Sequence, residues 1–78
     1  MSLAFDRKYK GHHIRASADQ DPYSKRWMAR ALVSWEQDGK RLYMTLYGKP
    51  NECETVLRAI ERAVDLAIIW IDDGKPQV

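Results

Sequence analysis

Residues 31–46 read ALVSWEQDGKRLYMTL, two alternating runs on either side of the dipeptide Asp38-Gly39. Asp-Gly is a strong signal for a two-residue type I′ turn, and a turn of that length sets the register of a β-hairpin. The register pairs Gln37 with Lys40 and continues residue by residue toward the open end of the hairpin. We therefore predict that an antiparallel hairpin organises the chain.

This register separates the hairpin side chains by face. Three pairs fall on an apolar face, namely Trp35/Leu42, Val33/Met44 and Ala31/Leu46. Three others fall on the opposite face, namely Glu36/Arg41, Ser34/Tyr43 and Leu32/Thr45. A slip of one residue would move every side chain to the other face, so the clean separation supports the pairing. We expect the apolar face to meet a helix.

The C-terminal third carries the pattern of a helix with one buried face, because apolar residues recur at spacings of three and four. They are Cys53, Val56, Leu57, Ile60, Ala63, Val64, Ala67, Ile68 and Ile71. We expect Asn51 as the N-cap, with Glu54 completing a capping box, and Gly74 as the left-handed residue after the helix. The predicted helix covers residues 51–73.

Residues 12–18 predict one further strand, in which Ile14, Ala16 and Ala18 point inward. Lys10-Gly11 is expected to turn the chain just before it, which leaves residues 5–9 as an optional short edge strand. The predicted fold is α+β: a three-stranded antiparallel sheet, with this optional fourth N-terminal strand, packed on one C-terminal helix in the order β-β-β-α.

The length of 78 residues predicts a single domain, 1–78. We assign 9–48 to the sheet, 51–73 to the helix, 74–78 to a tail, and 1–8 to a disordered segment or tag remnant. A chain this short buries only about 60% of its unfolded surface, so self-association is an expected source of extra stability. One cysteine and no long apolar run favour a reducing compartment, and we expect the cytoplasm.

The net charge of +2 comes from 13 basic and 11 acidic side chains, and it identifies no partner. Its distribution is uneven, because residues 1–50 hold ten Lys/Arg and five Asp/Glu, whereas residues 51–78 hold three and six. The sheet half is therefore basic and the helix half acidic. Nucleic acid, an acidic protein or a second copy of the chain could each use this asymmetry.

The residues capable of chemistry form no catalytic or metal-binding motif. His12 and His13 are neighbours on a predicted strand, so they point to opposite faces and cannot easily share a metal ion. Cys53 lies on the predicted apolar helix stripe, where a thiol is usually an inert packing group. We therefore predict a protein that is not an enzyme and that has no metal site and no cofactor.

One helix over three strands cannot bury every large apolar side chain of the helix. Leu66 and Trp70 flank the predicted buried stripe, and Ile69 projects away from it among charged residues. A cluster of exposed apolar groups is typical of an interaction site. We predict homodimerisation or protein–partner binding through Leu66, Ile69 and Trp70, with an exposed edge strand as a second route.

The outer face of the sheet offers an alternative function. It is expected to gather Arg15, Arg30, Arg41, Tyr43 and Tyr47. Cationic groups interleaved with aromatic rings can hold phosphates and stack bases, which favours single-stranded nucleic acid binding. The competing interpretation is a solvated face, which antiparallel sheets often have.

Two short motifs carry a resemblance. Residues 9–14 (YKGHHI) and residues 70–72 (WID) resemble the opening strand and the helix end of small bacterial domains of unknown function. The likeness covers about residues 9–73 and implies a β-β-β-α fold without an established activity. The strand order is also similar to HicB-type antitoxin partial folds and to single-stranded-DNA-binding domains that end in a helix. We expect a small non-enzymatic binding or regulatory protein that acts as a homodimer.

Overall fold

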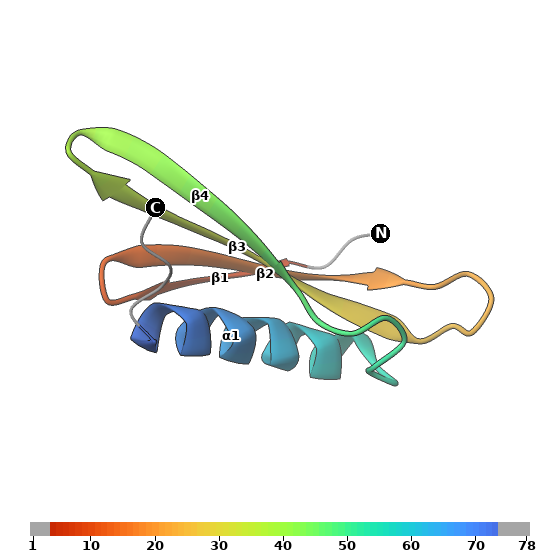
Figure 1. Ribbon diagram of the computed structural model, residues 1–78. Coiled ribbons are helices and arrows are strands. Elements are labelled where there is room, and N and C mark those ends of the chain that lie inside the picture. The colour runs from red at the N-terminus through yellow and green to blue at the C-terminus, as the bar shows by residue number, and fades with distance from the viewer. Residues whose placement is uncertain (1–3, 74–78) are drawn as a thin grey trace.

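The computed structural model describes residues 4–73 and shows one sheet packed against one helix (Figure 1). The elements are β1 (Ala4–Tyr9), β2 (His12–Gln20), β3 (Trp27–Gln37), β4 (Lys40–Tyr47) and α1 (Val56–Asp72). The strands follow one another across the sheet in chain order, each antiparallel to the next. The α+β class with a C-terminal helix is confirmed, with four strands where three and an optional fourth were predicted.

The β3–β4 hairpin has the predicted register along its whole length. Gln37 pairs with Lys40, and Val33 pairs with Met44. Asp38 and Gly39 have φ angles of 54° and 77°, the left-handed conformation that a type I′ turn requires. Val33 is fully buried against the helix. Alternation and turn chemistry together were therefore sufficient to predict this pairing.

The strand β1 pairs with β2 from Tyr9↔His12 back to Ala4↔Ser17. The sheet therefore begins at Ala4. Residues 4–8, which were predicted to be disordered or a tag remnant, belong to the sheet. Lys10 and Gly11 form the connecting turn with φ angles of 47° and 76°. Lysine rarely adopts a positive φ, so Lys10-Gly11 is a weaker turn signal than Asp38-Gly39.

The helix α1 begins later than the predicted residue 51. Thr55 is the N-cap, and its Oγ1 accepts a hydrogen bond from the Arg58 amide at 3.2 Å. Asn51 instead has a φ of 59°, and its carbonyl accepts a 2.7 Å bond from Nε of Arg26. The prediction of an Asn51 cap with a Glu54 capping box was wrong, because contacts with the loop before β3 hold this segment out of the helix.

Cys53 is buried, as predicted, but it does not lie in the first helical turn. It forms an isolated antiparallel bridge with Trp27, in which the two residues exchange backbone hydrogen bonds of 2.8 and 3.0 Å. Cys53 thus extends the edge of the sheet beyond Tyr47. Local helical periodicity could not reveal this pairing, since its partner lies 26 residues earlier in the chain.

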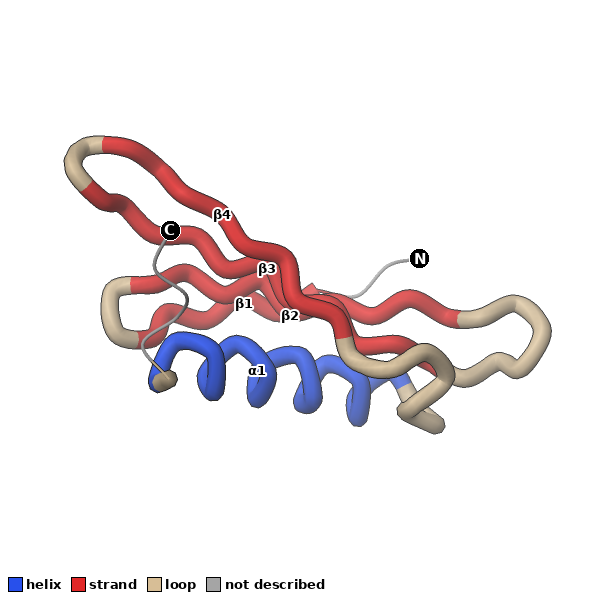
Figure 2. Tube along the Cα trace, viewed as in Figure 1, coloured by secondary structure: helices blue, strands red, loops and turns tan. Residues whose placement is uncertain are grey.

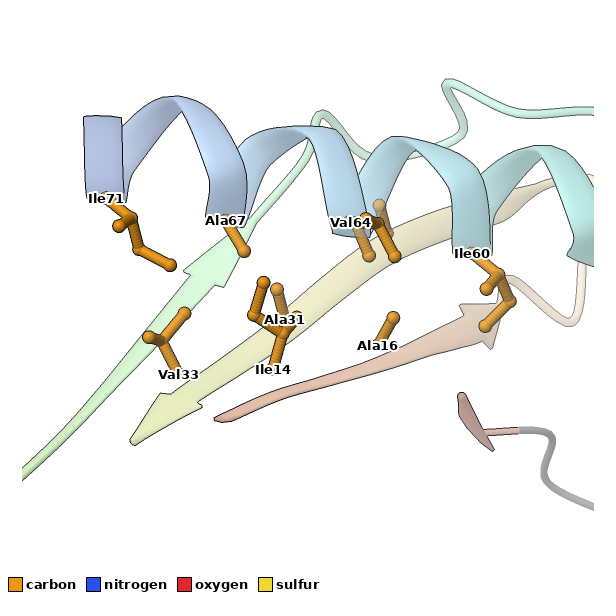
Figure 3. Packing of buried hydrophobic residues seen from close by; sticks show 10 residues of the cluster. Ile14, Ala16, Ala31, Val33, Ile60, Val64, Ala67 and Ile71 are labelled. Atoms are coloured by element: carbon orange, nitrogen blue, oxygen red, sulfur yellow. The ribbon is translucent and has the colours of Figure 1, made fainter. Parts of the chain in front are cut away.

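The core lies between α1 and the two central strands (Figure 3). Ile14 and Val33 are its largest fully buried side chains. Within the described residues, the other fully buried positions are all alanine: Ala16, Ala29, Ala31, Ala59, Ala63 and Ala67. Small side chains on both layers allow the helix to lie close to β2 and β3, which makes this core thin.

The buried face of α1 is rotated slightly from the predicted one. Ala59, which is not part of the predicted stripe, is fully buried, whereas Leu57, which was expected within the stripe, is 67% exposed. Leu57 lies on the side of the helix that faces β1. Few residues of β1 approach the helix, so this side has little strand above it. The prediction for Leu57 was wrong for that reason.

The described part of the helix ends at Asp72, with Asp73 as its C-cap. The predicted terminator Gly74 and the predicted tail 74–78 lie outside the described residues, as do residues 1–3. Within the described part, no helix combines the length and the apolar character that crossing a bilayer requires.

Candidate functional site

Leu66, Ile69 and Trp70 lie on the second half of α1. Ile69 is 54% exposed, whereas Leu66 and Trp70 are partly buried and pack against the core. The ring of Trp70 lies 5.4 Å from that of Trp35 on β3, measured between centroids. Leu66 lies one helical turn before Trp70 and shares its side of the helix. Leu66 and Trp70 therefore mark the flank of α1 that faces the β3–β4 hairpin, and Ile69 lies beside this flank on the solvent side of the helix.

The apolar flank continues onto β4. Leu42, Met44 and Leu46 occupy alternate positions on this strand and share the helix-facing side of the sheet with Val33. Met44 and Leu46 are partly buried, and Leu42 is 37% exposed. We call the six residues on α1 and β4 the flank surface: Leu42, Met44, Leu46, Leu66, Ile69 and Trp70.

The flank surface exists because one helix is narrower than four strands. Four strands spaced by about 4.8 Å span roughly 14 Å between the outer backbones, and their side chains extend further. A helix with its side chains is only about 10–12 Å wide. Helix α1 lies below β2 and β3, and the far end of the β3–β4 hairpin rises away from it (Figure 2). The inner side of β4 is therefore poorly covered.

Sequence reasoning identified the helix half of this surface and missed the β4 half. The apolar face of the hairpin was expected to lie wholly against the helix. The width of the sheet could have shown which strands the helix covers. One helix cannot reach a strand added beyond the third.

An aromatic contact joins the flank surface to the end of the sheet. Trp35 packs between Trp70 and His12, with ring centroids 5.4 Å away on each side. Tilted rings at this separation attract one another in addition to the area that they bury. His12 thus faces the helix side, whereas His13 faces the other side and places Nε2 3.2 Å from Asp6. The prediction that the two histidines point to opposite faces is confirmed.

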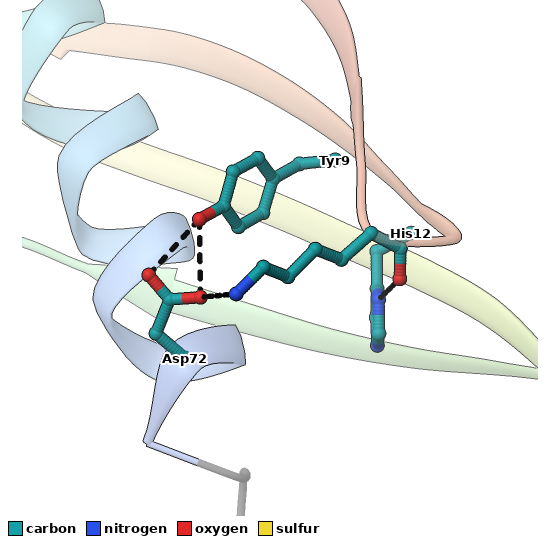
Figure 4. A network of polar contacts seen from close by, with 4 residues as sticks. Tyr9, His12 and Asp72 are labelled. Atoms are coloured by element: carbon teal, nitrogen blue, oxygen red, sulfur yellow. Dashed lines mark hydrogen bonds and ion pairs between the residues drawn. The ribbon is translucent and has the colours of Figure 1, made fainter.

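Asp72 anchors the end of α1 to the β1–β2 turn (Figure 4). Its carboxylate accepts a 2.7 Å bond from Nζ of Lys10, and the Tyr9 hydroxyl donates one bifurcated bond to both carboxylate oxygens, each at 3.0 Å. The bond from Lys10, followed by that from Tyr9, lowers the pKa of Asp72 below its ordinary value. The same bond and the negative charge of Asp72 raise the pKa of Lys10. This cluster fixes the helix beneath β1 and β2 at one end.

The outer face of the sheet brings together the five residues of the nucleic-acid alternative. Arg15, Arg30, Arg41, Tyr43 and Tyr47 occupy positions whose pairing places them on the side away from α1. Tyr43 and Tyr47 are 64% and 59% exposed, and roughly 13 Å of strand separates them. The face has the predicted composition and lies open to solvent.

The arginines of that face are compensated by acids on the same face. Arg15 lies 3.2 Å from Asp6. Arg30 lies 3.5 Å from Asp19, and Arg41 lies 3.6 Å from Glu36. Exposed pairs of this kind stabilise a fold little, about 0–1 kcal/mol each. They do lower the positive potential that a phosphate backbone would meet.

The groups capable of nucleophilic chemistry lie far apart. Cys53 pairs with Trp27 at one end of β3, and His12 stacks on Trp35 at the other end. Eight residues of strand separate these points by roughly 26 Å. One open concavity lies between β1 and the start of α1 and includes Cys53, while another borders His12 and His13. Among the described residues, no three His, Cys, Asp or Glu side chains could hold a metal ion together.

A comparison with protein-family models, curated proteins and solved structures finds no match for this chain.

Proposed function

We propose that this protein is a small binding or regulatory protein that acts as a homodimer through the flank surface. The observation that carries the proposal is the continuity of apolar side chains from α1 onto β4, with Ile69 and Leu42 open to solvent. Contiguous apolar patches on small proteins are typical of interaction sites. A domain with a core made largely of alanine also gains from burying this surface.

A non-enzymatic role is part of the proposal. It is supported by the separation of Cys53 from His12 and by the open form of the concavities that border them. Catalytic nucleophiles need a base within hydrogen-bonding reach, and ligand sites usually enclose most of the ligand surface. We also propose a cytoplasmic location, since the lone cysteine suits a reducing compartment.

Sedimentation equilibrium at protein concentrations of about 10–100 μM tests the homodimer. A dimer with a binding free energy of ~8 kcal/mol or weaker begins to dissociate in this range. The expected mass is twice the 9.1 kDa of the chain. Ile69→Glu should shift the population toward the monomer, because it places a charge within the apolar contact. A monomeric wild-type chain over this range would remove the basis of the proposal.

Leu57→Glu is the matched control for Ile69→Glu. Leu57 is also an exposed apolar residue of α1, but it lies on the side of the helix next to β1, away from Leu66 and Trp70. Both variants change the net charge equally, so a shift shared by the two would reflect charge and not the flank surface.

Single-stranded nucleic acid binding through the outer face is the second candidate. The specific observation in its favour is the exposure of Tyr43 and Tyr47 beside three arginines on an open sheet face. Exposed rings on a sheet can stack bases regardless of sequence. The three ion pairs on that face reduce its attraction for phosphates, so this candidate ranks below the homodimer.

A further inference from the structure

At alternate residues, the outer edge of β4 carries backbone groups that have no hydrogen-bond partner within residues 4–73. The Gly48 amide donates to the Ala29 carbonyl at 2.9 Å, which continues the ladder one pair beyond Arg30↔Tyr47. Residues of an antiparallel strand direct both backbone groups alternately toward and away from a neighbour. The even residues of β4 therefore bond to β3. The odd residues Arg41, Tyr43, Thr45 and Tyr47 direct their N–H and C=O groups outward.

The composition of this edge favours strand pairing. Residues 42–47 read LYMTLY and contain no charge, glycine or proline. Natural sheets usually protect an edge with charged residues or proline, and an apolar edge without them is a site for strand addition. The opposite edge of this sheet has such protection, because Asp6, Arg7 and Lys8 are consecutive in β1. The two edges of the sheet thus differ in kind.

The side chains of β4 match a second copy of the same strand. If the two copies are related by a two-fold axis perpendicular to the sheet, their inner faces lie on the same side. Even-numbered residues of one β4 must then lie opposite even-numbered residues of the other, and odd opposite odd. A two-fold axis at Met44 opposes Leu42 to Leu46 on the inner face. On the outer face it opposes Tyr43 to Thr45 and Arg41 to Tyr47, where a guanidinium can lie over an aromatic ring.

Two-fold axes at the residues next to Met44 give less favourable side-chain pairs. An axis at Thr45 opposes Arg41 to Lys49, which brings like charges together, and leaves Leu42 opposite Gly48. An axis at Tyr43 opposes Lys40 to Leu46 on the apolar inner face. Only the axis at Met44 opposes no like charges and also pairs the outward-directed backbone groups of Arg41, Tyr43, Thr45 and Tyr47.

We propose that the homodimer forms by antiparallel pairing of β4 with β4 of a second copy about a two-fold axis at Met44. This inference rests on the homodimer proposed above and names its mode. The pairing joins two four-stranded sheets into one continuous sheet. It places both α1 helices on the same face, so that Leu66, Ile69 and Trp70 of each copy border the seam.

Cysteine cross-linking tests the register. Met44→Cys in a Cys53→Ser background places two thiols at a non-hydrogen-bonded pair, where the Cα atoms are about 4.5 Å apart and a disulfide fits. Diamide, which takes two electrons and two protons from a pair of thiols, should convert most of the protein to a covalent dimer. Thr45→Cys in the same background is the control, since its two Cα atoms would lie roughly 9 Å apart, beyond disulfide range.

A proline variant tests the backbone pairing independently. Thr45→Pro removes an outward-directed N–H and no bond to β3, so the hairpin should persist, as shown by an unchanged far-UV circular dichroism spectrum. We expect this variant to sediment as a monomer. Thr45→Val, which keeps the N–H, should sediment as a dimer.

The outcomes of these experiments distinguish strand pairing from the homodimer proposal on which it rests. A wild-type dimer that shows no Met44→Cys cross-link and whose Thr45→Pro variant stays dimeric would overturn strand pairing. It would leave direct docking of the helix flanks in its place. Equal cross-linking of Met44→Cys and Thr45→Cys would overturn the register. A wild-type monomer would overturn both proposals.

Discussion

The carboxylate of Asp72 shows how one side chain links elements that are distant in sequence. It receives hydrogen bonds from Tyr9 and Lys10, which lie more than sixty residues earlier. No periodicity reveals such a contact, because each partner lies at the end of its own element. By contrast, the opposite orientations of His12 and His13 follow from strand alternation alone and were predictable.

Asp72→Asn should destabilise the fold near neutral pH and have less effect in acid. The folded-state pKa of Asp72 is lowered from 3.8, so its stabilising contribution is present above that value and is lost as the pH falls through the folded pKa. The raised pKa of Lys10 sets the opposite limit, because the contribution is complete below 10.5 and is lost as the pH rises through the higher folded-state pKa. Thermal unfolding measured from pH 2 to 11 checks both limits.

Asp73→Asn serves as the control for that series. Asp73 is an exposed neighbour of equal charge whose side chain makes no hydrogen bond or ion pair within residues 4–73. A melting temperature that responds equally to both substitutions at pH 7 would show that the Asp72 cluster adds no specific stability.

At the scale of elements, the spacing of apolar residues located α1 but not its exact orientation. The predicted stripe contained both Ile60 and Leu57, and the structure buries the first and exposes the second. The helix rotates toward its alanines because Ala59, Ala63 and Ala67 allow close approach to β2 and β3. Which side of an apolar stripe is covered depends on the strand above it, and β1 lies too far toward the edge to cover Leu57.

Substitution of each residue by alanine tests this orientation. Ile60→Ala should lower the free energy of unfolding by about 2–5 kcal/mol, since it leaves a cavity beneath the sheet. Leu57→Ala should change it by no more than ~0.5 kcal/mol, as is usual at exposed positions. Chemical denaturation of both variants under identical conditions provides the comparison. Equal losses would mean that the helix presents a different face to the sheet.

At the scale of the molecule, the charge asymmetry between the two halves does not make the sheet face strongly basic. Asp6, Asp19 and Glu36 lie among the arginines and oppose them one by one. The total for residues 1–50 could not reveal this, because it counts charge along the chain and not on one face. Any binding of nucleic acid would depend on the local potential, which the acids of the outer face make less positive.

Removal of two of these acids should therefore strengthen any binding of single strands. We expect Asp19→Asn/Glu36→Gln to bind a fluorescein-labelled oligothymidylate more tightly than the wild type at low salt. The plot of log affinity against log salt concentration should become steeper, by an amount equal to up to about two additional phosphate contacts. Fluorescence anisotropy titrations at several salt concentrations measure both quantities.

The control changes the net charge equally on the other side of the molecule. Glu61→Gln/Asp65→Asn alters two exposed acids of α1. A gain as large as that of the outer-face variant would indicate attraction by net charge alone. Absence of binding by every variant at tens of micromolar protein would end the nucleic-acid candidate.

Short-range patterns were enough to derive the α+β class, the hairpin register and the inward side of β2. Each of these depends on residues close together in the chain: the Asp38-Gly39 turn and the alternation of side chains in a strand. The odd–even alternation of backbone groups along the edge of β4 also follows from the register. These features do not depend on how the helix packs against the sheet.

Tertiary structure alone decided where α1 begins, which side of it is buried, and how much of β4 it covers. Arg26 and Trp27 hold residues 51–53 out of the helix through contacts across a long separation in the chain. The width of four strands against one helix then leaves the inner side of β4 open. Both effects depend on distances between elements, which a pattern along one element does not contain.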